Sequence, residues 1–147
     1  MTTILLPVTD HGRWTRAVAT VAATIEDDDT DAVVLYAFTD ADVESTTDHL
    51  GIDDNPELDE LAQRKSGVGQ ALSVLEDGGI DTEVYGLAVE DRTGEEILAV
   101  ASDREVDRIY MYSRKRTPAG KAVFGSALQR VLFDSDVPVV VTPPNVA

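Results

Sequence analysis

The chain alternates between short apolar segments and longer amphipathic segments along its whole length. Apolar residues run almost without a break through most of the short segments, which is typical of strands buried on both faces. In the longer segments they recur at helical spacing. This alternation predicts an α/β fold with a parallel sheet, helices on both faces and right-handed crossovers. The expected strands are residues 3–8, 32–38, 82–88, 106–112 and 137–143, and the expected helices are residues 13–25, 55–77, 93–102 and 127–133.

Length and composition fit one globular domain that spans residues 1–147. At 147 residues with 43% hydrophobic content, the chain can bury a full core. The absence of cysteine excludes disulfides, thiol catalysis and cysteine metal sites, and it suits a reducing compartment. With only two histidines besides, we expect no metal site.

The net charge of −16 argues against partners that are themselves anionic. Nucleic acids and anionic membrane surfaces both require a basic face, so we expect neither as a partner. The start of the chain has no basic lead and its apolar run is too short for a signal peptide, which predicts a cytoplasmic protein. The acidic residues are spread along the chain, which suggests either a high-salt cytosol or an acidic partner-binding surface.

The segment between the fourth strand and the last helix is basic, in contrast to the rest of the chain. Four of the twelve Lys and Arg residues lie within it: Arg114, Lys115, Arg116 and Lys121. It ends at Gly125-Ser126, where the last helix begins. A helix start presents unpaired N–H groups and the positive end of the helix dipole, which together suit a phosphate. The alternative is a solvated loop whose cations balance neighbouring carboxylates.

Ligands of parallel sheets bind beyond the carboxyl ends of the strands, where the strand order reverses. We expect that reversal between the first and fourth strands, which brings residues 9–12 beside residues 112–126. His11 lies in the first of these loops, near the expected pocket. It is either a ligand contact or a solvated histidine, and the second interpretation is favoured. His49, in the acidic segment 39–55, is interpreted as a surface residue. Trp14, one turn into the first helix, is interpreted as a core or interface residue.

With these features in place, the whole chain resembles the universal stress protein family. The resemblance rests on the Pro7-Val8 end of the first strand, the capping-box spacing of Thr93 and Glu96, Gly125-Ser126 and the closing strand from Val137. The basic segment is similar to that of haloarchaeal members. The resemblance implies a three-layer sandwich of the adenine nucleotide alpha hydrolase type, with strand order 3-2-1-4-5. It also implies a homodimer through the last strand, with Val137, Val139, Val140 and Val141 at the interface.

Nucleotide-binding members of that family carry Gly, two residues, Gly, nine residues, then Gly-Ser. Counting back from Gly125, the first two glycines fall on Tyr112 and Lys115, so the pattern departs at both positions. An aspartate that usually follows the first strand would fall on Thr9, with Asp10 one residue late. A glycine has no side chain and lets the backbone approach the sugar and phosphate closely, whereas Tyr112 and Lys115 place large side chains at these two positions.

Three functions follow from these observations. The first is a non-enzymatic stress-response protein that binds ATP or AMP, with Mg²⁺ if the ligand is a triphosphate, or a related anion. The second is the same dimer with the site plugged by Tyr112 and Lys115, acting through partners. The third is an ATP-using enzyme of related topology. Resemblance to that class would require a Ser-Gly-Gly-x-Asp-Ser type loop after the first strand, which Thr9-Asp10-His11-Gly12 does not supply, so this function ranks low. The expected nucleotide contacts, none of them catalytic, are Pro7, Val8, Thr9, Asp10, Ala37, Met111, Tyr112, Ser113, Arg114, Lys115, Lys121, Gly125, Ser126 and Ala127.

Overall fold

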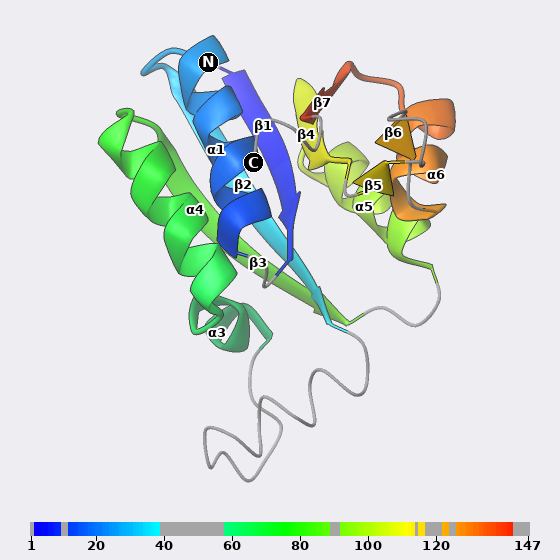
Figure 1. Cartoon of the computed structure of the whole chain (residues 1–147), viewed down its shortest axis with the longest axis horizontal. Coiled ribbons are helices and arrows are strands. Elements are labelled where there is room, and N and C mark those ends of the chain that lie inside the picture. Colours follow the sequence, from blue (N-terminus) through cyan, green and yellow to red (C-terminus); the bar gives the residue numbers. More distant parts are fainter. Residues whose placement is uncertain are drawn as a thin grey trace, which may run out of the picture.

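The protein is built around a five-stranded parallel sheet of order β3-β2-β1-β4-β7, which confirms the expected order (Figure 1). The computed structural model describes residues 2–9, 12–38, 58–88, 92–113, 115–116, 122–123 and 126–142. Within these residues every neighbouring pair of strands in this sheet is parallel. The strands are β1 (Thr2–Val8), β2 (Thr30–Phe38), β3 (Asp81–Ala88), β4 (Arg108–Tyr112) and β7 (Val139–Thr142).

Helices cover both faces of the sheet and make it the middle of three layers (Figure 1). One face, here called the α1 face, packs against α1 (Gly12–Ile25), α3 (Leu58–Gln63) and α4 (Ser66–Asp77). The other, the α5 face, packs against α5 (Thr93–Asp103) and α6 (Ser126–Asp134). None of the helices in the described ranges is long and apolar enough to span a bilayer.

Side chains of the central strands alternate between two hydrophobic clusters. In β1, Ile4 and Leu6 are buried on the α1 face, and Leu5 is buried on the α5 face. In β4, Tyr110 lies on the α1 face and Ile109 on the α5 face. The continuous apolar runs that predicted these strands therefore reflect burial on both sides of the sheet. β3, which was expected at an edge, is an edge strand and has several exposed positions.

The segment expected to form one helix over residues 55–77 forms two, within the residues that are described there. Lys65 has an extended backbone (φ −73°, ψ 132°) between α3 and α4. The break lets α3 turn against the edge strand, where Asp59 Oδ1 accepts a hydrogen bond of 2.7 Å from the Gly86 N–H. The expected helix start at Asn55 lies outside the described residues.

Two local predictions are wrong, one at a helix start and one at an acidic turn. Thr93 was expected to cap its helix but is the first residue of α5, while Arg92 at the cap position makes no side-chain capping bond. The acidic turn 26–31 was interpreted as solvated, yet the Glu26 side chain is 4% exposed and Thr30 begins β2. The partners of Glu26 lie on β4, which the local sequence does not indicate.

The basic segment contains an antiparallel hairpin that the sequence did not predict. Its strands are β5 (Lys115–Arg116) and β6 (Ala122–Val123), with Lys115 opposite Val123 and Arg116 opposite Ala122. Strands of two residues are too short to show an alternation of polar and apolar positions. The segment expected to be a loop therefore folds back on itself before α6.

Candidate site at the carboxyl ends of β1 and β4

The strand order reverses between β1 and β4, as expected. The two strands pair in parallel, with Ile4 opposite Arg108 and Leu5 opposite Ile109. β1 leads into α1 on one face of the sheet, and β4 leads through the hairpin β5–β6 into α6 on the other face. Connections that leave two neighbouring strands for opposite faces open a crevice beyond the strand ends.

The candidate residues on β1, β2 and β4 fall on both faces of the sheet at this end. By strand alternation, Pro7, Ala37 and Met111 point to the α5 face, and Met111 belongs to the cluster there. Val8 and Tyr112 pack on the α1 face. A ligand that touches both sets has to lie across the end of the sheet.

The remaining described candidates differ in accessibility. Thr9 is exposed and its carbonyl oxygen accepts a hydrogen bond of 2.9 Å from Thr15 Oγ1, which joins the end of β1 to the first turns of α1. Ser113 is buried, with 1% exposure. Ser126 is exposed as the first residue of α6, followed by half-buried Ala127. Outside the described residues lie Asp10, Arg114, Lys121, Gly125, His11 and His49, together with the side chain of Lys115.

Tyr112, at the end of β4, is in contact with a second aromatic side chain. Its ring stacks on Trp14 from the first turn of α1, with centroids 5.3 Å apart and planes at 20°. Both side chains are half-buried. The Tyr112 ring is thereby held on the α1 face, on the opposite side of the sheet from α6. Trp14 was interpreted from the sequence as a core or interface residue. Its stacking on Tyr112 could not be predicted from any local sequence pattern, because 98 positions separate the two residues.

Thr142, at the end of β7, is a further polar residue that the sequence analysis did not single out. It is the register partner of Tyr112, so its side chain lies beside that ring on the α1 face. The neighbouring backbone is paired, since the Ser113 N–H donates to the Thr142 carbonyl at 3.0 Å. Thr142 is 1% exposed, and its hydroxyl oxygen has no hydrogen-bond partner in the described part of the chain.

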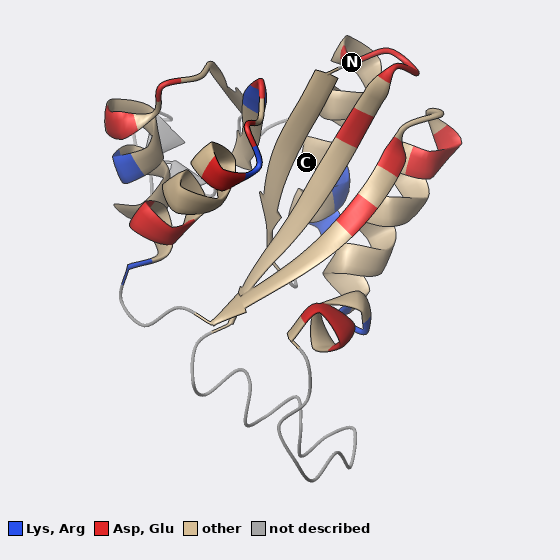
Figure 2. Cartoon of the chain, turned by 180° about the vertical axis from the view of Figure 1, so that it is seen from behind, with Lys and Arg blue, Asp and Glu red and all other residues tan. Residues whose placement is uncertain are grey.

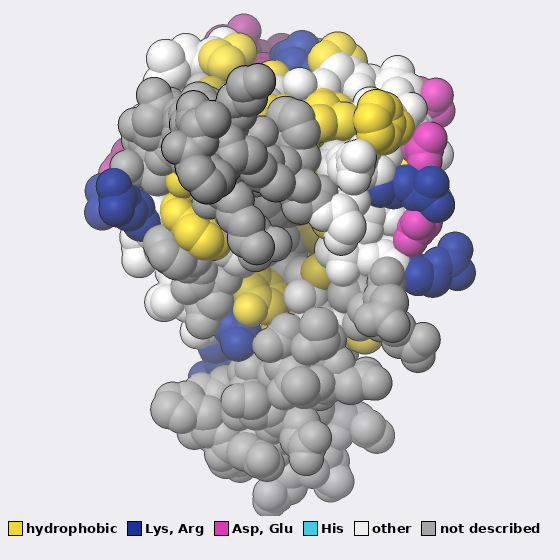
Figure 3. Space-filling view, turned by 45° about the vertical axis from the view of Figure 1, so that its right-hand side comes forward, with side chains coloured by type: hydrophobic (Ala, Val, Ile, Leu, Met, Phe, Trp, Pro, Cys, Tyr) yellow, Lys and Arg dark blue, Asp and Glu magenta, His cyan; other side chains and the backbone are white. Residues whose placement is uncertain are grey.

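The start of α6 is held in place by its packing on α5. Arg130 Nε donates to Glu95 Oε1 at 2.8 Å, and Arg130 also pairs with Asp134 one turn later. A Cβ on Gly94 would lie 2.7 Å from the Arg130 Cβ, so the two helices meet closely at that glycine. Acidic and basic side chains also stand next to one another along one side of the molecule in Figure 3.

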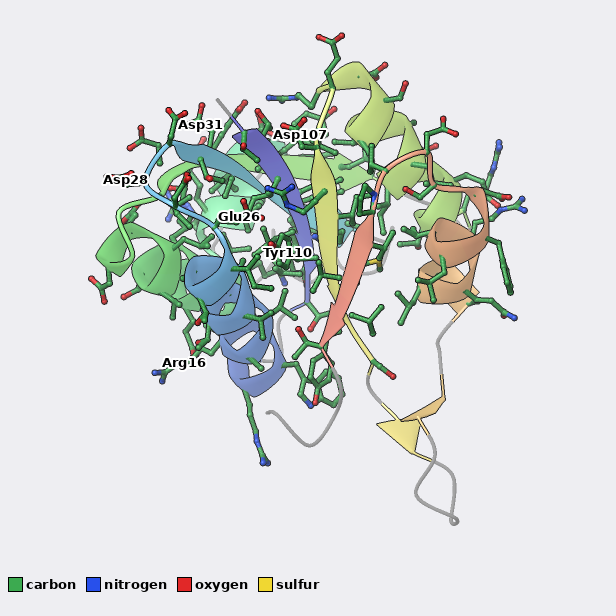
Figure 4. All side chains as sticks on the ribbon, turned by 90° about the horizontal axis from the view of Figure 1, so that it is seen from above. Arg16, Glu26, Asp28, Asp31, Asp107 and Tyr110 are labelled. Carbon is green, nitrogen blue, oxygen red and sulfur yellow. The ribbon has the colours of Figure 1, made fainter. Side chains whose placement is uncertain are left out.

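The most strongly paired ionisable groups lie at the opposite, amino end of the sheet. Figure 4 shows Glu26 and Tyr110 there, with Asp28, Asp31 and Asp107 nearby. Arg108 donates two hydrogen bonds to the Glu26 carboxylate, from Nε to Oε2 at 2.6 Å and from Nη2 to Oε1 at 2.5 Å. The Tyr110 hydroxyl also donates to Glu26 Oε2. The Arg108 hydrogen bonds hold the Glu26 pKa below its ordinary value, and burial raises the Tyr110 pKa above its own.

A groove of about 410 Å³ also lies at the amino ends of β1, β2 and β3. Its carboxylates come from Asp31, Asp81 and Glu83, and Arg104 Nη1 pairs with Glu83 Oε1 at 2.6 Å. Figure 2 shows acidic positions in red on strands and helices over much of this side. Across the described ranges, no three His, Cys, Asp or Glu residues are grouped so as to hold a metal ion.

Comparisons with known proteins agree with the fold. The model of one protein family, described as the Universal stress protein family, matches residues 1–143. A search of curated proteins found no match.

Three solved structures share the fold over nearly the whole chain. The universal stress protein from Archaeoglobus fulgidus matches with a TM-score of 0.70 at 19% identity, over 96% of this chain and 98% of that chain. Its complex with dAMP gives 0.63 at 16% identity, over 96% and 97%. A universal stress protein in complex with cAMP gives 0.62 at 14% identity, over 97% of each chain. Identities this low establish the fold alone.

Proposed function

The chain belongs to the universal stress protein family, and from that premise we propose that it is a homodimer that binds an adenine nucleotide and acts by binding, not by catalysis. The site is the crevice beyond β1 and β4. The observation that carries the proposal is the reversal of strand order at that point, which brings Thr9, Ser113 and the start of α6 to one end of the sheet. Structures of the same fold from other proteins hold dAMP and cAMP.

The phosphate end of the site is the start of α6. Ser126 is the exposed first residue of this nine-residue helix, and its first N–H groups have no partner within a helix. Arg114, Lys115 and Lys121 precede it in the sequence and bring positive charge to this part of the chain, which favours a phosphate. Mg²⁺ accompanies a triphosphate, held mainly by the phosphates and water.

The plugged-site alternative is weakened by the position of Tyr112. Stacking on Trp14 keeps the ring on the α1 face, whereas the phosphate end lies on the α5 face. The Tyr112 ring therefore lies on the opposite face of the sheet from α6, although Tyr112 takes a position where the nucleotide-binding members have glycine. Lys115 has its backbone in the hairpin, and its residue type suits a phosphate as a point charge.

The homodimer forms through the free edge of β7. Among the described residues β7 pairs only with β4, and Val139, Val140 and Val141 are half-buried in the single chain. An unpaired edge strand with apolar side chains is stabilised by pairing with a second copy. Val137 packs partly against the α5-face cluster next to this edge.

A thermal-shift titration tests the nucleotide site. AMP, ADP and ATP, with and without Mg²⁺, are added to the full chain in concentrated KCl. A ligand at 100 times its Kd stabilises the folded protein by about 2.7 kcal/mol. If none of the three raises Tm, the crevice is not a nucleotide site. If Tyr112→Gly gains a shift that the wild-type protein lacks, the plugged dimer is correct; steady conversion of ATP to AMP would instead identify an enzyme.

The excess of negative charge suits concentrated salt. With a net charge of −16, the surface repels itself and its anionic ligand in dilute buffer. Screening shortens the range of that repulsion to about 3 Å at 1 M salt. We therefore place the protein in a high-salt cytoplasm, where repulsion of the nucleotide is smallest.

A further inference from the structure

The five-stranded sheet ends in two outer strands, and the longer of them is β3. β3 has eight residues, whereas β7, at the other side of the sheet, has four. An outer strand presents backbone N–H and C=O groups that can pair with a strand of another chain. A longer strand presents more of them, so β3 would be the stronger pairing edge if it were open along its whole length.

The carboxyl-terminal half of the β3 edge is closed by α3. Asp59 Oδ1 accepts a hydrogen bond of 2.7 Å from the Gly86 N–H, which therefore points away from β2. The start of α3 lies directly against the strand here, since a Cβ on Gly86 would be 2.1 Å from the Leu58 carbonyl oxygen. Figure 2 shows α3 alongside the outer edge of β3. Asp59 thus occupies a backbone donor that an added strand would need.

The amino-terminal half of the same edge has no such cover among the described residues. Successive residues of a strand direct their N–H groups to alternate sides, so Thr82 and Val84 point outward as Gly86 does. No hydrogen bond joins either N–H to a backbone group outside the sheet in the described ranges. The donors of this half are therefore accessible to a strand of a second copy.

Charge protects this open half only in dilute salt. Asp81 and Glu83 are exposed there, and like charges that face one another across two strands oppose pairing. Glu83 is already paired with Arg104 at 2.6 Å, which reduces that repulsion. At 1 M salt the range of the remaining repulsion falls to about 3 Å. In concentrated salt, the contact with α3 is therefore the main protection of the β3 edge.

We propose that the outer edge of β3 is a second self-pairing surface, and that α3 keeps it closed through Asp59, so that the chain pairs only through β7. The inference rests on the proposed homodimer. Once the contact is lost, β3 pairs with β3 of a second copy. Each copy then has two pairing edges, and the assembly continues past two chains. The bond from Gly86 to Asp59 thereby limits the assembly to a dimer.

Light scattering in concentrated KCl tests the inference with two independent ways of opening the edge. Asp59→Ala frees the Gly86 N–H, and Gly86→Ala forces α3 away by a clash with its backbone. Both variants should give a mass about twice that of wild type or more, which increases with protein concentration. Asp59→Asn is the matched control, because it keeps an acceptor oxygen, and it should have the mass of wild type.

A second substitution on β3 separates strand pairing from aggregation of unfolded protein. In the Asp59→Ala background, Thr82→Pro removes an outward N–H without removing a bond to β2, and it should restore the mass of wild type. Thr82→Val keeps that N–H and should leave the larger assemblies unchanged. An aggregate of unfolded chains would not distinguish the two variants, so equal masses for them would overturn the inference.

The remaining outcomes separate this inference from the proposed homodimer. Asp59→Ala combined with Val140→Asp should give a dimer through β3, whereas Val140→Asp alone should give monomer. If wild type is a monomer and Asp59→Ala is a dimer, pairing through β7 is wrong and the β3 surface stands. If Asp59→Ala has the mass of a wild-type dimer, or if Asp59→Asn assembles as Asp59→Ala does, the homodimer stands and the β3 inference is overturned.

Discussion

At the scale of single residues, Glu26 shows how one side chain fixes the end of a helix. It follows α1 directly and reaches across to β4, where Arg108 and Tyr110 hold its carboxylate. The Glu26 side chain is 4% exposed and that of Arg108 is 33% exposed, so the pair is only partly open to solvent. Removal of the carboxylate would leave the Tyr110 hydroxyl, in a fully buried residue, without this acceptor.

We predict that Glu26→Ala lowers the free energy of unfolding by about 2 kcal/mol, measured by urea denaturation at neutral pH. Removing one partner of a fully buried ion pair costs about 3–5 kcal/mol, and the partial hydration of Arg108 reduces this cost. The control is Glu60→Ala, because within the described part of the chain Glu60 makes only an exposed pair with Arg64 at 3.4 Å. That variant should lose at most about 0.5 kcal/mol. Equal losses in the two variants would show that the Glu26 pair contributes nothing beyond a surface contact.

The same residue predicts a pH dependence. The folded-state pKa of Glu26 is lowered, mainly by its hydrogen bonds to Arg108. A carboxylate of this kind stabilises the folded protein fully above its unfolded pKa, and the contribution disappears as pH falls through the folded pKa. The difference in unfolding free energy between wild type and Glu26→Gln should therefore stay constant from pH 8 down to about pH 5 and shrink below about pH 4.5. A difference that grows in acid would contradict the assigned pairing.

At the scale of elements, the periodic segments could be predicted and the contacts between distant segments could not. Burial on both faces gives β1, β2 and β4 their apolar runs, and edge exposure gives β3 its alternation. The break at Lys65 leaves no such trace, because its cause is the docking of α3 on Gly86, more than twenty positions later. In the same way, topology predicts where the candidate site lies, whereas the Trp14–Tyr112 stack and the Thr142 hydroxyl depend on contacts across the fold.

Gly86 is the residue that lets α3 approach the edge of the sheet. A Cβ at this position would lie 2.1 Å from the Leu58 carbonyl oxygen and 3.0 Å from the Asp59 nitrogen. These are backbone atoms, so the helix itself has to move. We predict that Gly86→Ala displaces α3, breaks the bond from the Gly86 N–H to Asp59, and lowers the free energy of unfolding by about 2 kcal/mol. Hydrogen exchange should show faster exchange in α3 than in α1.

Gly69 provides the matched control for that substitution. It lies within α4, and a Cβ added there would meet no atom within 4 Å. Alanine in an open helical position stabilises a protein by about 0.5–1 kcal/mol relative to glycine. The two Gly→Ala changes should therefore move stability in opposite directions. If Gly86→Ala is tolerated as well as Gly69→Ala, α3 is not docked at the edge of the sheet.

At the scale of the whole molecule, the two ends of the sheet carry different candidate features. At the amino end, a groove is lined by Asp31, Asp81 and Glu83, and Arg104 forms an ion pair with Glu83. The carboxyl end carries the proposed nucleotide site and is followed by the basic segment. The carboxylates of the amino end disfavour an anionic ligand there, whereas the basic segment supplies positive charge after β4.

The same excess of negative charge acts on the proposed dimer. Each copy carries a net charge of −16, so two copies repel one another unless salt screens them, while pairing of the β7 edges holds them together. We predict that light scattering shows a dimer in concentrated KCl and a larger monomer fraction in dilute buffer. Val140→Asp should give monomer at both salt concentrations, because it places a carboxylate on the half-buried edge strand.

The matched control is Ile25→Asp at the end of α1, where the native side chain is 56% exposed. It adds the same charge but lies on a different element from β7, so it should dimerise as wild type does in concentrated KCl. Because both variants carry one extra negative charge, any difference between them reports the location of the interface and not the total charge. A dimer that persists in Val140→Asp would remove β7 from the interface. Loss of the dimer in both variants would point to charge repulsion alone.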